Sequence, residues 1–253
     1  MTGVVTGHPV EFRQAAFRFG ARSILNGLNI SVATGETLVL LGRSGSGKTT
    51  ALRLVNGMLL PSAGTVLVRG RATTEWDAVQ LRRSIGYVIQ EGGLFPHWTV
   101  ARNVGLVLEL ENQEAEKRSA RVAELLELVG LPAAEYGNRL PRQLSGGQRQ
   151  RVGVARALAA GASIMLFDEP FGALDPVTRM DMQDEFLRLR DTLGITSVFV
   201  THDVREAMRL GSRIGLLDEG ALVFAGTPRE FRSSTHRGAR AFLRVLEADS
   251  HAS

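Results

Sequence analysis

The segment Gly42–Thr49 constrains the fold of this chain more than any other. It has the sequence Gly-Arg-Ser-Gly-Ser-Gly-Lys-Thr and directly follows the apolar run Thr37–Leu41. A G-x-x-x-x-G-K-[S/T] pattern between a buried strand and a helix is typical of a phosphate-binding loop, in which backbone N–H groups and the helix dipole hold an anion. The segment therefore predicts an α/β fold with a phosphate loop at the end of one strand.

The residue types in this loop indicate the part that each plays. Glycines allow the backbone to wrap the phosphates, Lys48 reaches the β and γ oxygens, and the Thr49 hydroxyl is a ligand for Mg²⁺. Only Lys48 and Lys117 are lysines among 30 basic residues, and a compact ammonium fits between phosphates where a planar guanidinium does not. The predicted nucleotide-binding residues of the loop are Gly42, Arg43, Ser44, Gly45, Ser46, Gly47, Lys48, Thr49 and Thr50.

Apolar runs separated by glycine turns and helical periods indicate an α/β sheet, and the closely spaced early runs suggest a small antiparallel sheet beside it. The predicted strands cover residues 10–17, 24–32, 37–41, 65–68, 85–89, 164–167, 197–200, 213–217 and 221–225. Residues 99 to about 160 show helical periods only, with Val122, Leu125, Leu126 and Val129 on one face. We expect one domain over 1–253, a helical insert over about 95–160 and a frayed tail over 247–253.

Composition and hydropathy indicate where in the cell the chain would act and which partners and sites are not expected. The longest apolar stretches are far shorter than the roughly 20 residues that cross a bilayer, and the first residues lack the pattern of an export signal. We therefore expect a cytoplasmic protein. The formal charge of +4 is modest and the arginines are spread along the chain, so nothing in the composition favours nucleic acid as a partner. The absence of cysteine excludes disulfides and thiolate metal sites.

The segment Ile164–Pro170, "IMLFDEP", supplies two carboxylates at the end of an apolar strand. Asp168 would be costly at that position unless it faced a cation, so we assign it to Mg²⁺. Glu169 is the candidate base that orients the attacking water and accepts its proton. Without the phosphate loop, a solvated strand end would be the preferred explanation of the same two residues.

Two further polar residues end predicted strands. His202 follows "TSVFV" and Gln90 follows "IGYVI", and the carboxyl ends of parallel strands are where open α/β sheets bind ligands. His202 is suited to donate to the γ-phosphate or to the attacking water, and Gln90 to contact Mg²⁺ or that water. The alternatives are a capping or packing histidine and an ordinary loop glutamine.

Residues 144–150, "LSGGQRQ", predict a second helix start built to hold an anion. Ser145 is a good N-cap residue, Gly146 and Gly147 expose two N–H groups, and an apolar face follows in the helix. A triphosphate wrapped by one loop still exposes its γ-phosphate. A second chain related by two-fold symmetry could cover it with this segment, so that each ATP would join two subunits.

The order of these motifs carries a family resemblance. Phosphate loop, Gln90, "LSGGQ", "IMLFDEP", the "FGALD" turn with Asp175, and His202 follow one another as in the ATP-binding-cassette (ABC) ATPases, which the chain resembles over nearly its whole length. The resemblance implies a P-loop NTPase core with a small N-terminal antiparallel β subdomain and an inserted α-helical subdomain, with ATP and Mg²⁺ as cofactors. It also implies a homodimer or a pair with a second ABC subunit.

The resemblance also implies roles for particular residues. Glu169 would polarise the attacking water, His202 would contact the γ-phosphate, and Asp175 would lie at the shared interface. An aromatic residue 23 positions before Gly42, which is Phe19 here, would stack on adenine; the alternative is a phenylalanine packed under the small sheet. The residues that would contact the nucleotide of the opposite subunit are Ser145, Gly146, Gly147 and Gln148.

A transport ATPase without membrane segments needs a membrane partner. Leu94, Phe95 and Trp98 lie in a glycine-rich loop, which is unusual for a segment that only faces water. We therefore expect the loop Leu94–Trp98 to contact an integral membrane permease, with local packing of the helical insert as the alternative. A substrate-binding protein would take part indirectly, and the chain would lie on the inner face of the cell membrane.

Several segments, among them "GTPREF", resemble the ATPases of importers for glycine betaine, choline and related osmoprotectants. Another cargo, such as an amino acid or a lipid, and export instead of import stay open. A different class is a soluble ABC ATPase that acts on nucleic acid or the ribosome; the long coiled-coil insertions, zinc modules or second cassette of such proteins are not found here. A third is an ATP-gated interaction module without turnover.

Overall fold

A computed structural model describes residues 8–89 and 93–250, the last four of these by backbone only. The described residues divide into two compact units, the first formed by residues 8–82 and 194–250 and the second by residues 83–89 and 93–193. The second unit is thus one continuous insertion in the sequence of the first. It begins before the predicted helical insert and ends after it, because it also contains two strands and a long helix.

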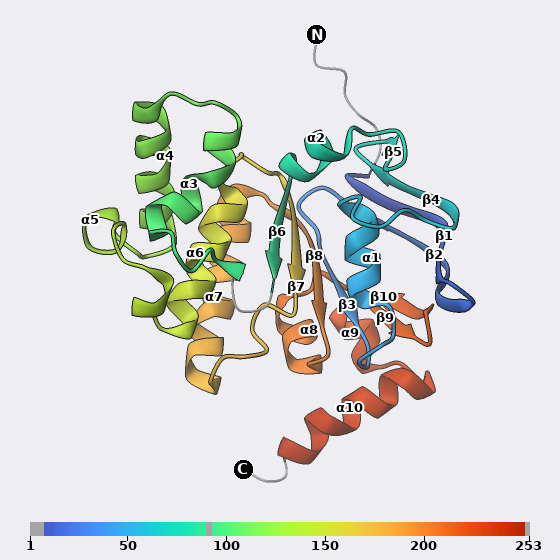
Figure 1. Cartoon of the computed structure of the whole chain (residues 1–253). Coiled ribbons are helices and arrows are strands. Elements are labelled where there is room, and N and C mark those ends of the chain that lie inside the picture. Colours follow the sequence, from blue (N-terminus) through green and yellow to red (C-terminus); the bar gives the residue numbers. More distant parts are fainter. Residues whose placement is uncertain (1–7, 90–92, 251–253) are drawn as a thin grey trace. The chain divides into compact units, whose positions relative to one another are not determined.

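The first unit contains the predicted small antiparallel sheet, with strand order β2-β1-β4-β5 (Figure 1). Alternation along β1 turns Val10 and Phe12 into the core, as expected of a sheet with one covered face, and Ala15 is buried beyond a register shift. A bulge interrupts the pairing of β1 near Gln14, whose φ is +49°. The strands are β1 (Val10–Phe19), β2 (Arg22–Val32), β4 (Ala63–Val68) and β5 (Arg71–Ala72).

The first unit also contains strands in the order β10-β9-β3-β8, of which β3 pairs in parallel with both β8 and β9. All five residues of β3 are buried, as is typical of a parallel strand covered on both faces. Its strands are β3 (Thr37–Leu41), β8 (Thr196–Thr201), β9 (Arg213–Asp218) and β10 (Ala221–Gly226). Its helices are α1 (Lys48–Val55), α2 (Ala78–Arg83), α8 (Val204–Leu210), α9 (Pro228–Arg232) and α10 (Arg237–Ser250).

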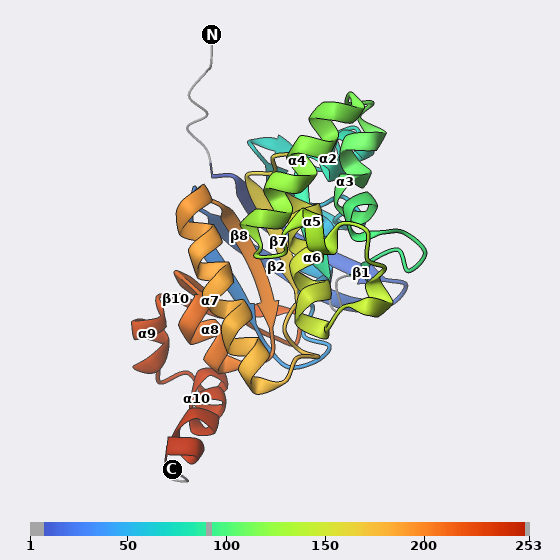
Figure 2. The ribbon, with the colours of Figure 1, turned by 90° about the vertical axis from the view of Figure 1, so that its left-hand side faces the viewer.

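In the second unit, β6 (Ile85–Ile89) and β7 (Ile164–Asp168) pair in parallel, and helices fill the sequence between them. Figures 1 and 2 show α3, α4, α5 and α6 gathered into one bundle. The predicted apolar face of α4 is buried, which confirms the helical period. The helices are α3 (Val100–Leu110), α4 (Ala115–Leu128), α5 (Ala133–Tyr136), the 3₁₀ turn Pro141–Gln143, α6 (Gly146–Leu158) and α7 (Pro176–Leu193).

All nine predicted strands occur in the structure, with ends that differ by a few residues at most. The two-residue strand β5 was missed because so short an edge strand has no recognisable period. Residues 247–250, predicted to be part of a frayed tail, continue α10, while residues 251–253 lie outside the described part. No helix within residues 8–89 and 93–250 is long and apolar enough to cross a membrane.

Candidate nucleotide-binding site

The phosphate loop has the geometry that its sequence predicts. It connects β3 to α1, and Gly45 and Gly47 have φ values of +79° and +99°, which residues with a Cβ rarely adopt. A Cβ on Gly47 would lie 2.8 Å from Cδ2 of Leu25, and one on Gly42 would lie 2.5 Å from the carbonyl oxygen of Leu217. Conformation and close packing thus both require glycine in this loop.

The ammonium of Lys48 lies inside the loop. Only 4% of the residue is exposed, and Nζ donates to the carbonyl oxygens of Gly42 (2.9 Å) and Arg43 (3.0 Å). A buried charge is tolerated because these carbonyl dipoles face it. The loop therefore places a positive charge beside its own backbone N–H groups, where an anion would meet both.

Two features of the loop fit a polyphosphate. No atom lies within 4 Å of the position that a Cβ on Gly45 would take, so the bend of the loop is open. The Ser46 hydroxyl is buried and has no hydrogen-bond partner among the described residues, which leaves a polar group unsatisfied next to the bend. The residues present are therefore suited to bind phosphate groups.

His202 lies at the same end of the strands as the phosphate loop. In the parallel register, Leu41 is opposite Thr201, so Gly42 and His202 each follow the last residue of a neighbouring strand. His202 is exposed, whereas Thr201 is buried and donates to Glu206 Oε2 (2.6 Å), which orders the turn after β8. This confirms the position expected for His202 on the sheet, while its contact with a γ-phosphate stays a prediction.

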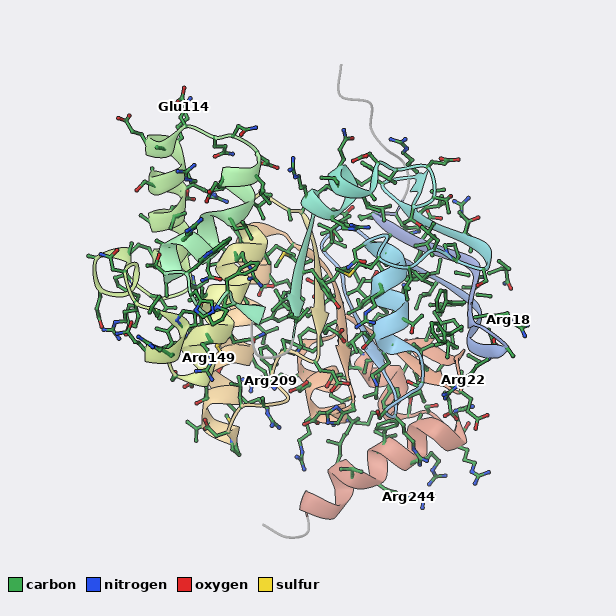
Figure 3. The ribbon with its side chains drawn as sticks, viewed as in Figure 1. Arg18, Arg22, Glu114, Arg149, Arg209 and Arg244 are labelled. Atoms are coloured by element: carbon green, nitrogen blue, oxygen red, sulfur yellow. The ribbon has the colours of Figure 1, made fainter. Side chains whose placement is uncertain are left out.

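Phe19 ends β1 and is 78% exposed, which rules out the alternative of a phenylalanine packed beneath the small sheet. Arg18 and Arg22 project from the same β1–β2 hairpin (Figure 3). An exposed aromatic ring next to cationic side chains is suited to stacking on a purine.

Asp168 is the last residue of β7 and accepts a hydrogen bond from Tyr87 Oη through Oδ2 (2.9 Å). No pattern in the sequence predicted that Tyr87 would contact Asp168. The parallel register pairs Tyr87 with Leu166 and Ile89 with Asp168, so alternation places Tyr87 and Asp168 on one face as diagonal neighbours. The tyrosine therefore orients the Asp168 carboxylate at the end of β7.

Glu169 has a φ of +47°, a left-handed conformation that is uncommon for a residue with a Cβ. Such strain costs of order 1–3 kcal/mol and clusters at functional sites. The residue follows directly on Asp168, so this uncommon backbone conformation lies at the end of β7. This observation agrees with distinct roles for Asp168 and Glu169.

The structure describes no group of three or more His, Cys, Asp or Glu side chains that could hold a metal ion within residues 8–89 and 93–250. Magnesium in phosphate-transfer sites is usually held by one or two carboxylates together with substrate phosphates and water. The carboxylate of Asp168 and the hydroxyl of Thr49 are each oxygen donors of the kind that Mg²⁺ binds. Gln90, the third predicted ligand, lies outside the described residues.

The helix α6 starts with a reciprocal cap. Ser145 Oγ accepts from the backbone N–H of Gln148 (3.2 Å), and Gln148 Oε1 accepts from the backbone N–H of Ser145 (2.9 Å). The first N–H groups of a helix have no partner within it, so the cap leaves those of Gly146 and Gly147 for a ligand. The structure confirms the predicted N-cap role of Ser145.

Gln148 has a structural role that the sequence did not show. Besides the cap, its Nε2 donates to Tyr136 Oη (3.4 Å), and the Arg139 guanidinium lies 4.3 Å from the centre of the Tyr136 ring. These contacts hold the first turn of α6 from the side, and the predicted contact of Gln148 with a nucleotide stays a prediction. Gly147 is required by packing, since a Cβ there would lie 2.6 Å from Cγ2 of Thr178.

Asp175 precedes α7 and caps it, accepting from the backbone N–H of Thr178 through Oδ1 (3.0 Å). Hydrogen bonds from the backbone and the side chain of Thr178 lower the pKa of this carboxyl group. Asp175 is exposed, so it is ionised and available at the surface of its unit. Its predicted place in a subunit interface remains a prediction.

Two residues of α3 hold the loop Leu94–Trp98: the Arg102 guanidinium lies 4.3 Å from the centre of the Trp98 ring, and Asn103 binds the backbone. Asn103 is fully buried; its Oδ1 accepts from Phe95 N (2.8 Å), and its Nδ2 donates to the carbonyl oxygens of Phe95, Trp98 and Thr99. The Phe95 and Trp98 rings stack with centres 4.4 Å apart, yet Phe95 remains 44% exposed. Local packing therefore explains the shape of the loop but leaves an aromatic face uncovered.

A phosphate loop on a parallel strand, an acidic strand end and a serine-capped helix that begins with two glycines define a P-loop nucleotide-binding cassette. The chain belongs to the ABC transporter family, whose family model matches residues 25–172. It is 49% identical to the glycine betaine/carnitine/choline transport ATP-binding protein OpuCA of Bacillus subtilis (strain 168), over 83% of this chain and 55% of that protein. The chain thus spans about half the length of that relative.

Two further comparisons agree. The chain is 45% identical to the glycine betaine uptake system ATP-binding protein YehX of Escherichia coli (strain K12), over 87% of this chain and 71% of YehX. A dimeric structure of the ATP-binding cassette MJ0796 in a post-hydrolysis state, bound to ADP and Pi, matches with a TM-score of 0.76 and 34% identity. That match covers 87% of this chain and 99% of the solved chain. The predicted family and fold class are therefore confirmed.

Proposed function

We propose that this chain hydrolyses ATP as the nucleotide-binding subunit of an ABC transporter and powers a separate membrane permease. The observation that carries the proposal is the start of α6, whose capping box uses its own side chains and leaves the N–H groups of Gly146 and Gly147 for a ligand. A chain that already has a phosphate loop gains from this second anion site if two copies enclose two ATP molecules.

Each residue of the site has its own role in binding or hydrolysing ATP. Lys48 and the loop N–H groups bind the phosphates, Glu169 orients water and accepts its proton, and His202 donates to the γ-phosphate. Mg²⁺, held by Thr49, Asp168 and Gln90, would neutralise charge on the transferred phosphoryl group. Ser145, Gly146, Gly147 and Gln148 of the second copy would complete each site, with Asp175 at the same interface.

The paired arrangement is tested by the concentration dependence of the ATPase rate. Turnover per chain should rise with protein concentration and level off once the dimer is saturated, because a single copy lacks half of each site. Ser145→Ala should lower turnover and shift the rise to higher concentration, since loss of an N-cap costs about 1 kcal/mol and loosens the helix start. A rate per chain that is constant with dilution and equal in Ser145→Ala would refute the proposal.

Phe19→Ala should weaken ATP binding without abolishing it. Stacking of a base on an aromatic ring is worth roughly 1–3 kcal/mol, and this ring is exposed at the end of β1. Titration with a fluorescent ATP analogue measures the loss, and Phe95→Ala, which removes an exposed ring from a different loop, serves as the control. Equal affinity in Phe19→Ala and the unchanged protein would remove Phe19 from the site.

We also propose that the loop Leu94–Trp98 contacts the permease. Phe95→Asp and Trp98→Asp should abolish co-purification with the permease and transport, because each places a charge on the aromatic surface that Asn103 holds in position. Leu110→Asp, at an exposed apolar site at the end of α3, is the matched control and should leave assembly unchanged. Normal assembly of both loop variants would show that the stacked rings serve local packing alone.

The proposed cargo is glycine betaine, choline or a related osmoprotectant, taken up with a substrate-binding protein, and the chain would act on the inner face of the membrane. Support comes from the names of the two relatives described above and from the length over which they match. Uptake of labelled glycine betaine by vesicles that contain the chain and its permease tests this cargo. Transport of a different solute alone would leave the ATPase assignment intact and reject the cargo.

A further inference from the structure

A cavity of about 400 Å³ lies in the first unit, behind the phosphate loop. Its walls come from the end of β9, the following turn, β10 and the start of α10, and Arg43 of the phosphate loop completes the lining. Its volume is within the range of small-molecule sites, about 300–1,000 Å³. Of its lining residues, only Arg43 belongs to the predicted nucleotide site.

Four charged side chains of both signs line the cavity and do not pair with each other. Arg43 and Arg237 are cationic, and Asp218 and Glu219 are anionic. Within the part of the chain that the structure describes, none of the four side chains makes a hydrogen bond or an ion pair. All four residues are exposed to solvent, so the cavity is open and both signs of charge line it.

The remaining lining suits an organic ligand. Leu216, Val223 and Phe242 contribute apolar surface, and Phe242 is half-buried. An aromatic face near carboxylates binds alkylated ammonium groups, whereas a guanidinium binds a carboxylate through two parallel hydrogen bonds. A purely anionic ligand would face Asp218 and Glu219, and a purely cationic one would face the arginines.

We propose that this cavity binds a small zwitterion, a molecule that carries a carboxylate and an alkylated ammonium group. The carboxylate is held by Arg43 and Arg237, and the ammonium group by Asp218, Glu219 and the ring of Phe242. Only a dipolar ligand satisfies both sets of charges at once.

The cavity shares its wall with the phosphate loop, so occupancy affects nucleotide binding. The carbonyl oxygen of Arg43 accepts from Lys48 Nζ (3.0 Å), and the carbonyl oxygen of Leu217, another lining residue, lies against Gly42. We expect a ligand that draws in the Arg43 side chain to shift this backbone carbonyl and, through it, the lysine. This coupling rests on the proposed function, whereas binding of the zwitterion does not.

Equilibrium dialysis of the full chain with labelled glycine betaine, without nucleotide, tests the site. We expect saturable binding, and binding at least about tenfold weaker for choline and for acetate, each of which carries one of the two charges. Arg237→Ala and Asp218→Asn should each weaken binding of glycine betaine by about tenfold or more. Arg244→Ala is the matched control, because Arg244 lies on α10 outside the cavity lining (Figure 3).

The proposal is overturned if glycine betaine shows no saturable binding to the folded chain, if choline or acetate binds as tightly, or if Arg237→Ala and Asp218→Asn bind it unchanged. ATP affinity measured with and without saturating glycine betaine tests the coupling, and equal values refute it. A chain that binds glycine betaine but not ATP would reject the proposed function and leave this site standing.

Discussion

Glu169→Gln should reduce ATP turnover by about 10²–10⁴-fold, the range expected when a general base is lost. The amide keeps the size and hydrogen-bonding shape of the carboxylate but does not accept the proton of the attacking water. Nucleotide binding should persist, so ATP is no longer cleared and the variant should accumulate as an ATP-bound dimer. Phosphate release and the sedimentation of the chain with ATP measure the two effects separately.

The matched control for this prediction is Glu124→Gln. Glu124 is exposed on α4 and pairs with Arg121, an interaction of the kind that contributes about 0.2–1 kcal/mol or less. The ATP turnover of Glu124→Gln should equal that of the unchanged chain. Full hydrolysis in Glu169→Gln would remove Glu169 from the mechanism, and a loss of ATP binding in that variant would assign it to the nucleotide site rather than to the chemical step.

Lys48→Ala should weaken ATP binding by about ten- to hundred-fold, since hydrogen bonds to charged groups contribute about 1.5–3 kcal/mol each. The ammonium is buried between two loop carbonyls, so its removal also leaves Gly42 and Arg43 carbonyl oxygens without that donor. Lys48→Arg should not restore binding, because a planar guanidinium does not fit between these carbonyls. Binding of a fluorescent ATP analogue and thermal unfolding with and without ATP measure the effect.

The chain offers one internal control for this substitution. Lys117 is the only other lysine, and its side chain is 76% exposed in an ion pair with Glu114. Lys117→Ala should bind ATP as the unchanged chain does. If Lys48→Ala bound ATP normally, the segment Gly42–Thr49 would not be the nucleotide site and the proposed function would fail with it.

The parts of the site that follow from local pattern were predictable. Positive φ at Gly45 and Gly47, the cap at Ser145 and the strand ends at Asp168 and His202 each depend on a few neighbouring residues, so the motif carries their geometry. The adenine-stacking proposal for Phe19 gained support only when the structure showed the ring exposed.

Other features depend on residues far apart in the chain and were not predictable. Tyr87 reaches Asp168 only because β6 and β7 pair in a particular register. Asn103 orders the Leu94–Trp98 loop from the next helix, and Tyr136 supports Gln148 across a turn, although neither has a recognisable motif. The left-handed φ of Glu169 could not be inferred either, because nothing in "DEP" requires it.

The amino-acid sequence by itself determined the phosphate loop, the start of α6, the alternation of strands and helices, and the family. Each of these depends on periodicity or backbone preference among residues that are close together in the chain. Only the tertiary structure decided which side chains share a face, which groups remain unpaired and that Arg43, Asp218, Glu219 and Arg237 surround one cavity. These residues are nearly two hundred positions apart at the extremes, and packing and strand register, which no local pattern encodes, bring them together.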